Sequence, residues 1–263
     1  MRPIAGSSEP LSQPAAGEPA GAPPERIAKL LARVGLCSRR DAERWIAAGR
    51  VSVDGRVLTT PAVTVTAAND IRVDGEPLPA FDRPRLWRYH KPAGLVTTHR
   101  DERGRPTVFD ALPKELPRVI SVGRLDLNSE GLLLLTNDGT LARRLELPAT
   151  GWVRRYKVRV HGEVDPDQLA RLEPGLTIDG VAYGPIHARL ERRQGSNAWI
   201  MMGLREGKNR EVRRVLEHLG LQVTRLIRLS YGPFQLGNLP RGAVDEVPKK
   251  VLAEQLGDAD RRR

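Results

Sequence analysis

A single carboxylate, Asp126, stands directly ahead of an apolar run in the segment Gly123–Gly139, with Arg124 two residues before it. Residues 132–135 are four consecutive leucines, too few to span a membrane and too continuous for a half-exposed strand. They predict a strand covered on both faces and closed by the turn Asn137-Asp138-Gly139. A carboxylate fixed at the start of such a strand can act as a nucleophile or as a base. The same residue could instead cap a turn, as aspartate commonly does.

A second segment, residues 205–216, is dense in arginine and predicts a helix over residues 209–219 that ends at Gly220. At about 100° per residue, one face of this helix is apolar: Val212, Val215, Leu216 and Leu219. Arg213 flanks that face, where an arginine that lines a cleft belongs. Lys208, Arg210 and Arg214 point outward and suit phosphate contacts. The alternative is a solvated basic helix.

The charge balance favours a polyanionic partner. The 263 residues include 43 Lys and Arg against 32 Asp and Glu, a formal net charge of +11, and 40% are hydrophobic, enough for a core. Nucleic acid is the leading candidate, because no apolar stretch approaches a membrane span and neither end carries a lipidation signal. The single Cys37 excludes a disulfide framework and a cysteine-based zinc site. Since residues 1–24 lack the apolar core of a secretory signal, we expect a cytoplasmic protein.

Composition and periodicity divide the chain into five parts. We expect a disordered leader over residues 1–24, a compact αα-β module over 25–75, a proline-rich linker over 76–84, a strand-rich domain over 85–256 and a basic tail over 257–263. In the module, a helix near residues 25–34 is followed by one that Ser38 caps and Gly49 ends. A ribbon with the hairpin turn Asp54-Gly55 then runs into residues 63–65 and 71–73.

The strand-rich domain has more predicted strands than helices, and many strands are hairpin-linked, so the predicted fold class is α+β with a largely antiparallel sheet. The strands are expected at residues 86–89, 94–98, 131–136, 156–160, around 179–180, 198–204 and 222–231. The helices are expected at residues 107–112, 140–147, from Asp165 onward, and 209–219.

The αα-β module resembles the S4 RNA-binding domain. The resemblance rests on residues 26–31, 38–43 and 46–55, which follow the order helix, helix and ribbon. It implies a basic face that neutralises phosphates and gives salt-sensitive affinity with little sequence readout. The arginines expected on this face are Arg39, Arg40, Arg44 and Arg50. The alternative is a solvated helix face.

Almost the whole chain, from Arg26 to Leu252, resembles the RsuA/RluB family of ribosomal RNA pseudouridine synthases. The resemblance rests on several motifs in the family's order: residues 90–98, 104–110, 123–139, 155–158 and 207–214. It departs from the family at Glu211, where glutamine is frequent, and we expect this difference to bear on RNA contact.

The resemblance implies that the chain is an isomerase that converts a uridine of ribosomal RNA to pseudouridine after flipping the base out of its stack. Asp126 would be the catalytic aspartate, acting by covalent attack or by deprotonating the sugar, with Arg213 pairing with it and keeping it ionised. Tyr156 would stack on the extracted uracil, and Arg124 would occupy the vacated site. Asn209 would join Lys208, Arg210 and Arg214 in contacting RNA. The reaction needs no metal and no redox or other small-molecule cofactor.

The resemblance is closer to the large-subunit members, so 23S ribosomal RNA is the expected partner of a monomeric enzyme, with 16S ribosomal RNA as the alternative. Two other functions compete. A glycoside or nucleoside hydrolase would use a second carboxyl, for which Glu130 is the nearest candidate. A non-catalytic RNA-binding assembly protein would need no set such as Asp126, Tyr156 and Arg213.

Overall fold

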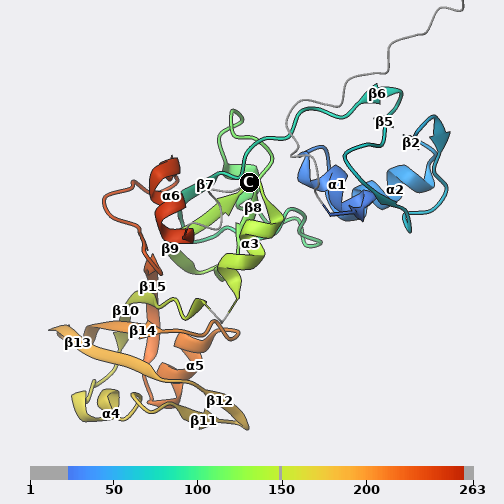
Figure 1. Cartoon of the computed structure of the whole chain (residues 1–263). Helices are drawn as coiled ribbons and strands as arrows, with labels where there is room; N and C mark the ends of the chain where they lie inside the picture. The colour runs from blue at the N-terminus through green and yellow to red at the C-terminus, as the bar shows by residue number, and fades with distance from the viewer. Residues whose placement is uncertain (1–22, 148–149, 258–263) are drawn as a thin grey trace, which may run out of the picture. The chain divides into compact units, whose positions relative to one another are not determined.

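The structure, a computed structural model, describes residues 23–147 and 150–257 in two compact units (Figure 1). The first unit ends at Arg83 and the second begins at Pro84. The expected leader, apart from its last two residues, and the expected tail, apart from Gly257, lie outside the described residues. No described helix is long and apolar enough to cross a bilayer.

The first unit packs two helices against short strands. The helices are α1 (Ile27–Arg33) and α2 (Arg39–Ala47), and Ser38 and Asp41 form a capping box at the start of α2. A four-stranded sheet follows in the order β3 (Arg56–Val57), β2 (Val51–Val53), β5 (Ile71–Val73) and β6 (Glu76–Pro77). Two details differ from the prediction. Strand β4 (Thr64–Val65) pairs with β1 (Glu25–Arg26) rather than with the ribbon, and residues 76–77 of the expected linker belong to the sheet.

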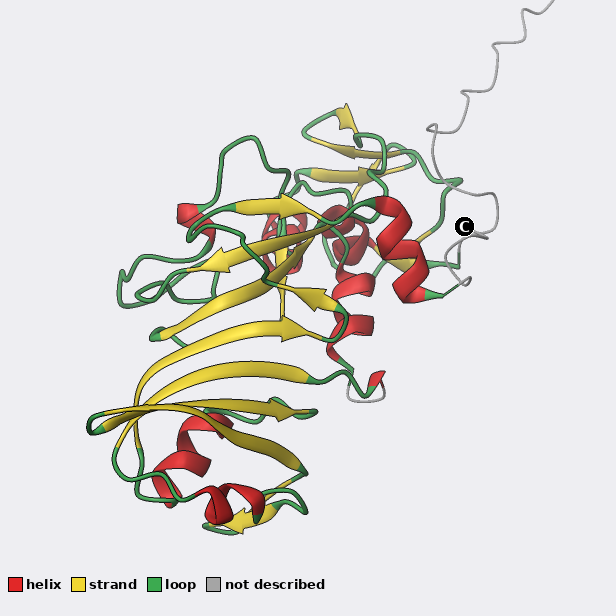
Figure 2. Cartoon of the chain, turned by 90° about the vertical axis from the view of Figure 1, so that its left-hand side faces the viewer, coloured by secondary structure: helices red, strands yellow, loops and turns green. Residues whose placement is uncertain are grey.

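The second unit is built on a nine-stranded sheet, which confirms the predicted α+β class. Its main path is β13-β14-β10-β15-β9-β7-β17, with β8 paired to β9 and β16 to β15. The bounds of these strands are β7 Leu86–Lys91, β8 Ile120–Val122, β9 Ser129–Thr136, β10 Arg154–His161, β13 Ile186–Gln194, β14 Asn197–Leu204, β15 Gln222–Tyr231, β16 Phe234–Gln235 and β17 Val244–Glu246. All pairs are antiparallel except β15 with β9. In Figure 2 the long strands lie side by side as one curved layer.

Helices cover the two halves of this sheet on opposite faces. The helices α4 (Pro166–Ala170) and α5 (Glu211–His218) pack with the buried side chains of β10, β14 and β15. The helices α3 (Gly139–Glu146) and α6 (Lys249–Leu256) pack on the other face of β7 and β9. All eight residues of β9 are buried, which confirms the strand covered on both faces. Between α4 and β13 the chain forms a small hairpin of β11 (Leu176–Ile178) and β12 (Val181–Tyr183). These two strands pair with each other and not with the nine-stranded sheet.

The prediction was wrong at residues 94–98, which form no strand, because only an isolated bridge joins Val96 to Thr107. The expected helix at residues 107–112 is a short 3-10 turn, Phe109–Ala111. The strand β13 was missed, since its outward positions are charged and its apolar positions are few. These differences fall in loops and at an edge, where local sequence pattern carries the least information about pairing.

Candidate active site around Asp126

The loop of residues 123–128, here called the Asp126 loop, is held by hydrogen bonds from one buried lysine. Lys91 at the end of β7 has no exposed surface, and its Nζ donates to the backbone carbonyls of Pro92, Asp126, Leu127 and Ser129 at 2.9 to 3.4 Å. Burial lowers the pKa of Lys91 to about 8, against the opposing attraction of the carboxylates of Asp126 and Glu130. The ammonium group of Lys91 therefore binds the carbonyl groups of the turn that carries Asp126.

Further hydrogen bonds fix the same loop from its sides. Thr97 Oγ1 donates to the carbonyl of Leu125 at 2.8 Å, and the amide of Gly94 donates to the carbonyl of Leu127 at 2.8 Å. The amide of Gly123 donates to a carboxylate oxygen of Glu146 on α3 at 2.7 Å. Asp126 itself is half-buried, so its carboxylate is held on a rigid loop and still reachable.

The parallel pairing of β9 with β15 brings the arginine-rich helix to this loop. A Cβ on Gly131 would lie 2.3 Å from the carbonyl oxygen of Arg228, and its φ is +101°. Only glycine tolerates this approach and this backbone conformation. Because α5 leads directly into β15, the close pairing places Arg213 against the end of the Asp126 loop.

Arg213 is buried and is bound to the loop through backbone. Its Nη2 donates to the carbonyl of Asn128 at 3.0 Å and its Nη1 to that of Val223 at 3.3 Å, while Nε is buried without a partner. Burial and the charge of Arg210 lower its pKa, and the charge of Asp126 opposes them. The two side chains thus interact electrostatically, but among the described residues they form no direct ion pair. The Nε group is unsatisfied but enclosed by protein in this conformation.

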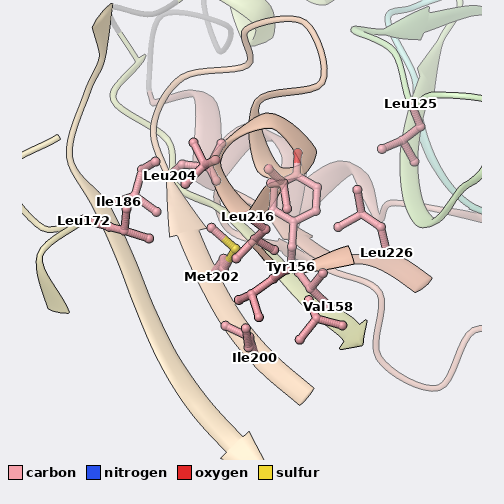
Figure 3. Packing of buried hydrophobic residues seen from close by; sticks show 14 of the residues in the cluster. Leu125, Tyr156, Val158, Leu172, Ile186, Ile200, Met202, Leu204, Leu216 and Leu226 are labelled. Atoms are coloured by element: carbon pink, nitrogen blue, oxygen red, sulfur yellow. The ribbon is translucent and has the colours of Figure 1, made fainter. Parts of the chain in front are cut away.

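Tyr156 lies on β10, two strands from β9 in the sheet. It is 8% exposed, and Figure 3 shows its ring beside Val158, Leu216 and Leu226, with its hydroxyl pointing away from the aliphatic cluster. Leu125 of the Asp126 loop belongs to the same apolar cluster. Leu125 and Tyr156 thus belong to one large apolar cluster, and Arg213 interacts electrostatically with Asp126, but no contact among the described residues joins Tyr156 to Asp126 or Arg213.

The other predicted RNA-contact residues of this unit are all exposed, but they differ in whether their side chains bind other parts of the protein. Arg124, Asn209, Arg210 and Arg214 are exposed. Lys208 is exposed too, but its Nζ contacts a carboxylate oxygen of Glu206 and the carbonyl of Ala182, both at 2.5 Å. Lys208 thus also ties its loop to the strand β12.

Glu211 corrects an expectation. It is 3% exposed, so it does not contact RNA; its Oε2 accepts the amide of Lys208 at 2.9 Å, and its Oε1 is buried without a partner. Burial raises its pKa. The side chain at this position closes the first turn of α5, a task that a glutamine could also perform.

The four arginines predicted for the S4-like module are exposed. Arg44 pairs with Asp41 on its own helix. Arg50 binds Asp74 through Nε at 2.9 Å and lies over the ring of Trp45 at 4.7 Å. Arg39 and Arg40, in the first turn of α2, carry no ion pair among the described residues and are the freest cations of this group.

Glu130, the possible second carboxyl of a hydrolase, is committed elsewhere. It is 7% exposed, accepts hydrogen bonds from Arg225 at 2.8 and 3.1 Å, and forms an ion pair with Arg241 at 2.8 Å. Burial alone would raise its pKa, but these arginines outweigh burial and lower it. A general acid needs the opposite shift, so the geometry does not support a two-carboxyl hydrolase.

Sequence reasoning missed the role of Lys91, although it lies in one of the motifs noted above. The available signal was its place at the end of an apolar strand before Pro92. Nothing in the local pattern showed that its side chain turns inward.

Two family models match the sequence: RNA pseudouridylate synthase over residues 85–218 and the S4 domain over residues 25–71. An uncharacterized RNA pseudouridine synthase of Rickettsia prowazekii is 49% identical over 232 residues, which cover 88% of this chain and 97% of that protein. The ribosomal large subunit pseudouridine synthase B of Yersinia pestis is 45% identical over 237 residues, covering 86% and 74%. The protein of the same name from Salmonella typhi is 45% identical over 260 residues, covering 91% and 89%. A crystal structure of a pseudouridylate synthase matches with a TM-score of 0.61 at 25% identity, covering 88% of this chain and 99% of that one.

Proposed function

The chain belongs to the RNA pseudouridylate synthase family and isomerises uridine to pseudouridine in RNA, and we propose that it does so on large-subunit ribosomal RNA with Asp126 as the catalytic residue. The observation that carries the proposal for Asp126 is the set of hydrogen bonds that Lys91 donates to the Asp126 loop and its neighbours. Three carbonyl groups of the turn at Asp126, together with that of Pro92, bind one buried ammonium group, so the loop is fixed while the carboxylate stays accessible. Such preorganisation is what a group acting on a sugar carbon requires.

The reaction moves one glycosidic bond without adding or removing atoms overall. The C1′–N1 bond of uridine breaks, the uracil rotates, a C1′–C5 bond forms, C5 loses its proton, and N1 gains one. Asp126 promotes the first step either by bonding to C1′ or by taking a proton from the ribose. The proton lost from C5 balances the proton gained at N1, so the reaction is an isomerisation without net oxidation or reduction.

The surrounding residues serve this step in distinct ways. Arg213 attracts the carboxylate of Asp126 electrostatically and fixes the end of its loop through the carbonyl of Asn128. Tyr156 stacks on the extracted base, for which its half-apolar surroundings are suited. The exposed Arg124, two residues before Asp126, steadies the position that the flipped base leaves.

The choice of large-subunit ribosomal RNA rests on the names of the relatives from Yersinia pestis and Salmonella typhi. Small-subunit ribosomal RNA is the alternative substrate. We further propose that the enzyme acts as a monomer in the cytoplasm, where ribosomal RNA is made and folded. The S4-like module, with Arg39 and Arg40 exposed, would add salt-sensitive affinity for structured RNA.

The test uses purified protein, transcripts of both ribosomal RNAs, and mapping of carbodiimide-modified positions. Asp126→Asn should lower the rate of pseudouridine formation by at least about a thousandfold while RNA affinity is nearly unchanged, because the substitution removes the charge but keeps the shape. Asp179→Asn, in the exposed turn between β11 and β12, is the matched control and should keep full activity. Retained turnover in Asp126→Asn would refute the assignment of Asp126. Modification of the small-subunit transcript alone would refute the choice of substrate.

A further inference from the structure

One face of the sheet in the β10–β15 half carries an unusual set of side chains. Along β10, Tyr156, Val158 and Val160 are buried against α4 and α5, and the residues between them point to the opposite face. We call that opposite face the outer sheet face. It is formed by side chains from four strands: Arg155, Lys157 and Arg159 of β10, Arg189 and Arg192 of β13, Trp199 and Met201 of β14, and Arg225 of β15.

The register aligns these side chains in rows across the strands. Arg192 is paired with Trp199, Trp199 with Arg159, and Arg159 with Arg225, so one row crosses four strands. The next row follows the same order, with Arg189 paired with Met201 and Met201 with Lys157. An aromatic ring thus lies in the middle of a row whose other three members are arginines.

This arrangement opposes stability rather than supporting it. Arg159 and Arg225 are direct cross-strand neighbours, and like charges in that position are destabilising. Lys157 is compensated by Glu191 at 2.7 Å, and Arg225 by Glu130. Arg159 and Arg192 form no ion pair among the described residues. Six cations against two carboxylates therefore leave a surface with a strong positive excess.

The row is continuous with the strand that bears the Asp126 loop. Arg225 reaches across to Glu130, the second residue of β9, and the same carboxylate holds Arg241. Glu130 lies four residues after Asp126, and Lys91 experiences the charges of both carboxylates. The loop bearing Arg241 is itself fixed, because the amide of Gly242 donates to the carbonyl of His90 at 2.8 Å. The positive surface thus extends from the β13 edge to the start of β9.

We propose that the outer sheet face is a second RNA-binding surface, on which a strand of the substrate RNA runs along the row Arg192–Trp199–Arg159–Arg225 toward β9. The arginines bind phosphates, and Trp199 offers a half-exposed ring on which a base stacks when Lys157, whose Nζ lies 5.2 Å from the ring centroid, moves aside. Arg225 and Arg241 are preorganised by the buried Glu130, so little side-chain entropy is lost when phosphate binds. The inference rests on the proposed function for the identity of the RNA. The surface itself lies on the sheet face opposite to α5 and Arg213.

The test compares two double variants of the full chain. Arg159→Gln with Arg192→Gln removes two uncompensated cations from the outer sheet face, and both side chains are accessible enough that the fold should persist. Arg143→Gln with Lys250→Gln removes two exposed cations from α3 and α6 as the matched control. Binding to transcripts of both ribosomal RNAs is measured by filter retention over a series of NaCl concentrations, together with kcat and KM.

The first variant should lower the magnitude of the slope of log affinity against log salt by about 1.4 to 1.8 and raise KM with kcat unchanged. The control should keep the slope of the wild type, and Arg159→Lys with Arg192→Lys should restore it. An unchanged slope in the first variant would overturn the proposal, and so would an equal loss in both variants, which would indicate general charge alone. If the wild type modified neither transcript but the slopes still separated, the proposed substrate would fail and this surface would stand.

Discussion

Replacing Lys91 with methionine tests how the Asp126 loop is held. The ammonium group lies in the interior, and burial sets its pKa at about 8, whereas the usual value of a lysine is 10.5. Between these two pH values the folded protein binds fewer protons at this residue than the unfolded chain does, so stability rises with pH. The contribution is fully present above pH 10.5 and is lost as pH falls through 8.

The size follows from the same two values. A gap of about 2.5 between them corresponds to about 3.5 kcal/mol at about 1.4 kcal/mol per pKa unit. Roughly 2 kcal/mol of this stability change should develop between pH 7 and pH 9.5, because the remainder develops between pH 9.5 and pH 10.5. At neutral pH the buried charge is therefore a cost to folding, which is offset by its hydrogen bonds to four carbonyls.

Urea unfolding of the wild type and of Lys91→Met at several pH values separates this residue from every other titrating group. The free energy of unfolding of the wild type, relative to the variant, should rise by about 2 kcal/mol between pH 7 and pH 9.5. The variant should also lose most of its pseudouridine formation at all pH values, because the carbonyls around Asp126 lose their shared donor. Parallel stability curves for the two proteins would refute the account of a buried charged lysine. Full activity in the variant would refute its role in fixing the loop.

Three further changes test other parts of the structure. Gly131→Ala should lower the free energy of unfolding by at least about 3 kcal/mol in urea titration, because its Cβ would lie 2.3 Å from the carbonyl oxygen of Arg228; a loss below about 1 kcal/mol would contradict that close approach. Glu211→Gln should be more stable than the wild type at pH 7, since burial raises the pKa of Glu211, and the difference should shrink as pH falls from the raised pKa toward the ordinary glutamate value; a pH-independent difference would contradict this. Deleting residues 1–75 should weaken RNA binding and flatten its salt dependence, and an unchanged salt slope by filter binding would exclude the S4-like module as a phosphate contact.

Sequence alone predicted much of the framework. The four leucines ahead of Asn137 predicted a strand covered on both faces, and all of β9 is buried. The helical spacing of apolar residues near Arg213 predicted α5 to within a few residues, and Ser38 caps α2 as expected. The resemblance to ribosomal RNA pseudouridine synthases is confirmed at the level of the family. These successes rest on local patterns, in which neighbours along the chain determine the structure.

The failures share another cause. The segment around Val96 has the composition of a strand but serves as a support for the Asp126 loop through Thr97. Glu211 occupies a position that suggested RNA contact, yet it closes the first turn of α5 from inside. In each case the decisive partner lies in backbone that the local pattern does not reveal, so composition could not predict the outcome.

The sequence by itself predicted Asp126, Tyr156 and Arg213 as site residues, indicated the amphipathic faces of the elements near them, and determined the family to which the chain belongs. Only the tertiary structure decided that Lys91 turns inward beneath Asp126, that Arg213 binds the loop through the carbonyl of Asn128, and that the arginines of four strands share one face. The physical reason is that burial and pairing are properties of contacts between distant segments. The type of a residue determines which ionisable group it carries, but the pKa and the partners of that group depend on the residues that the fold packs around it.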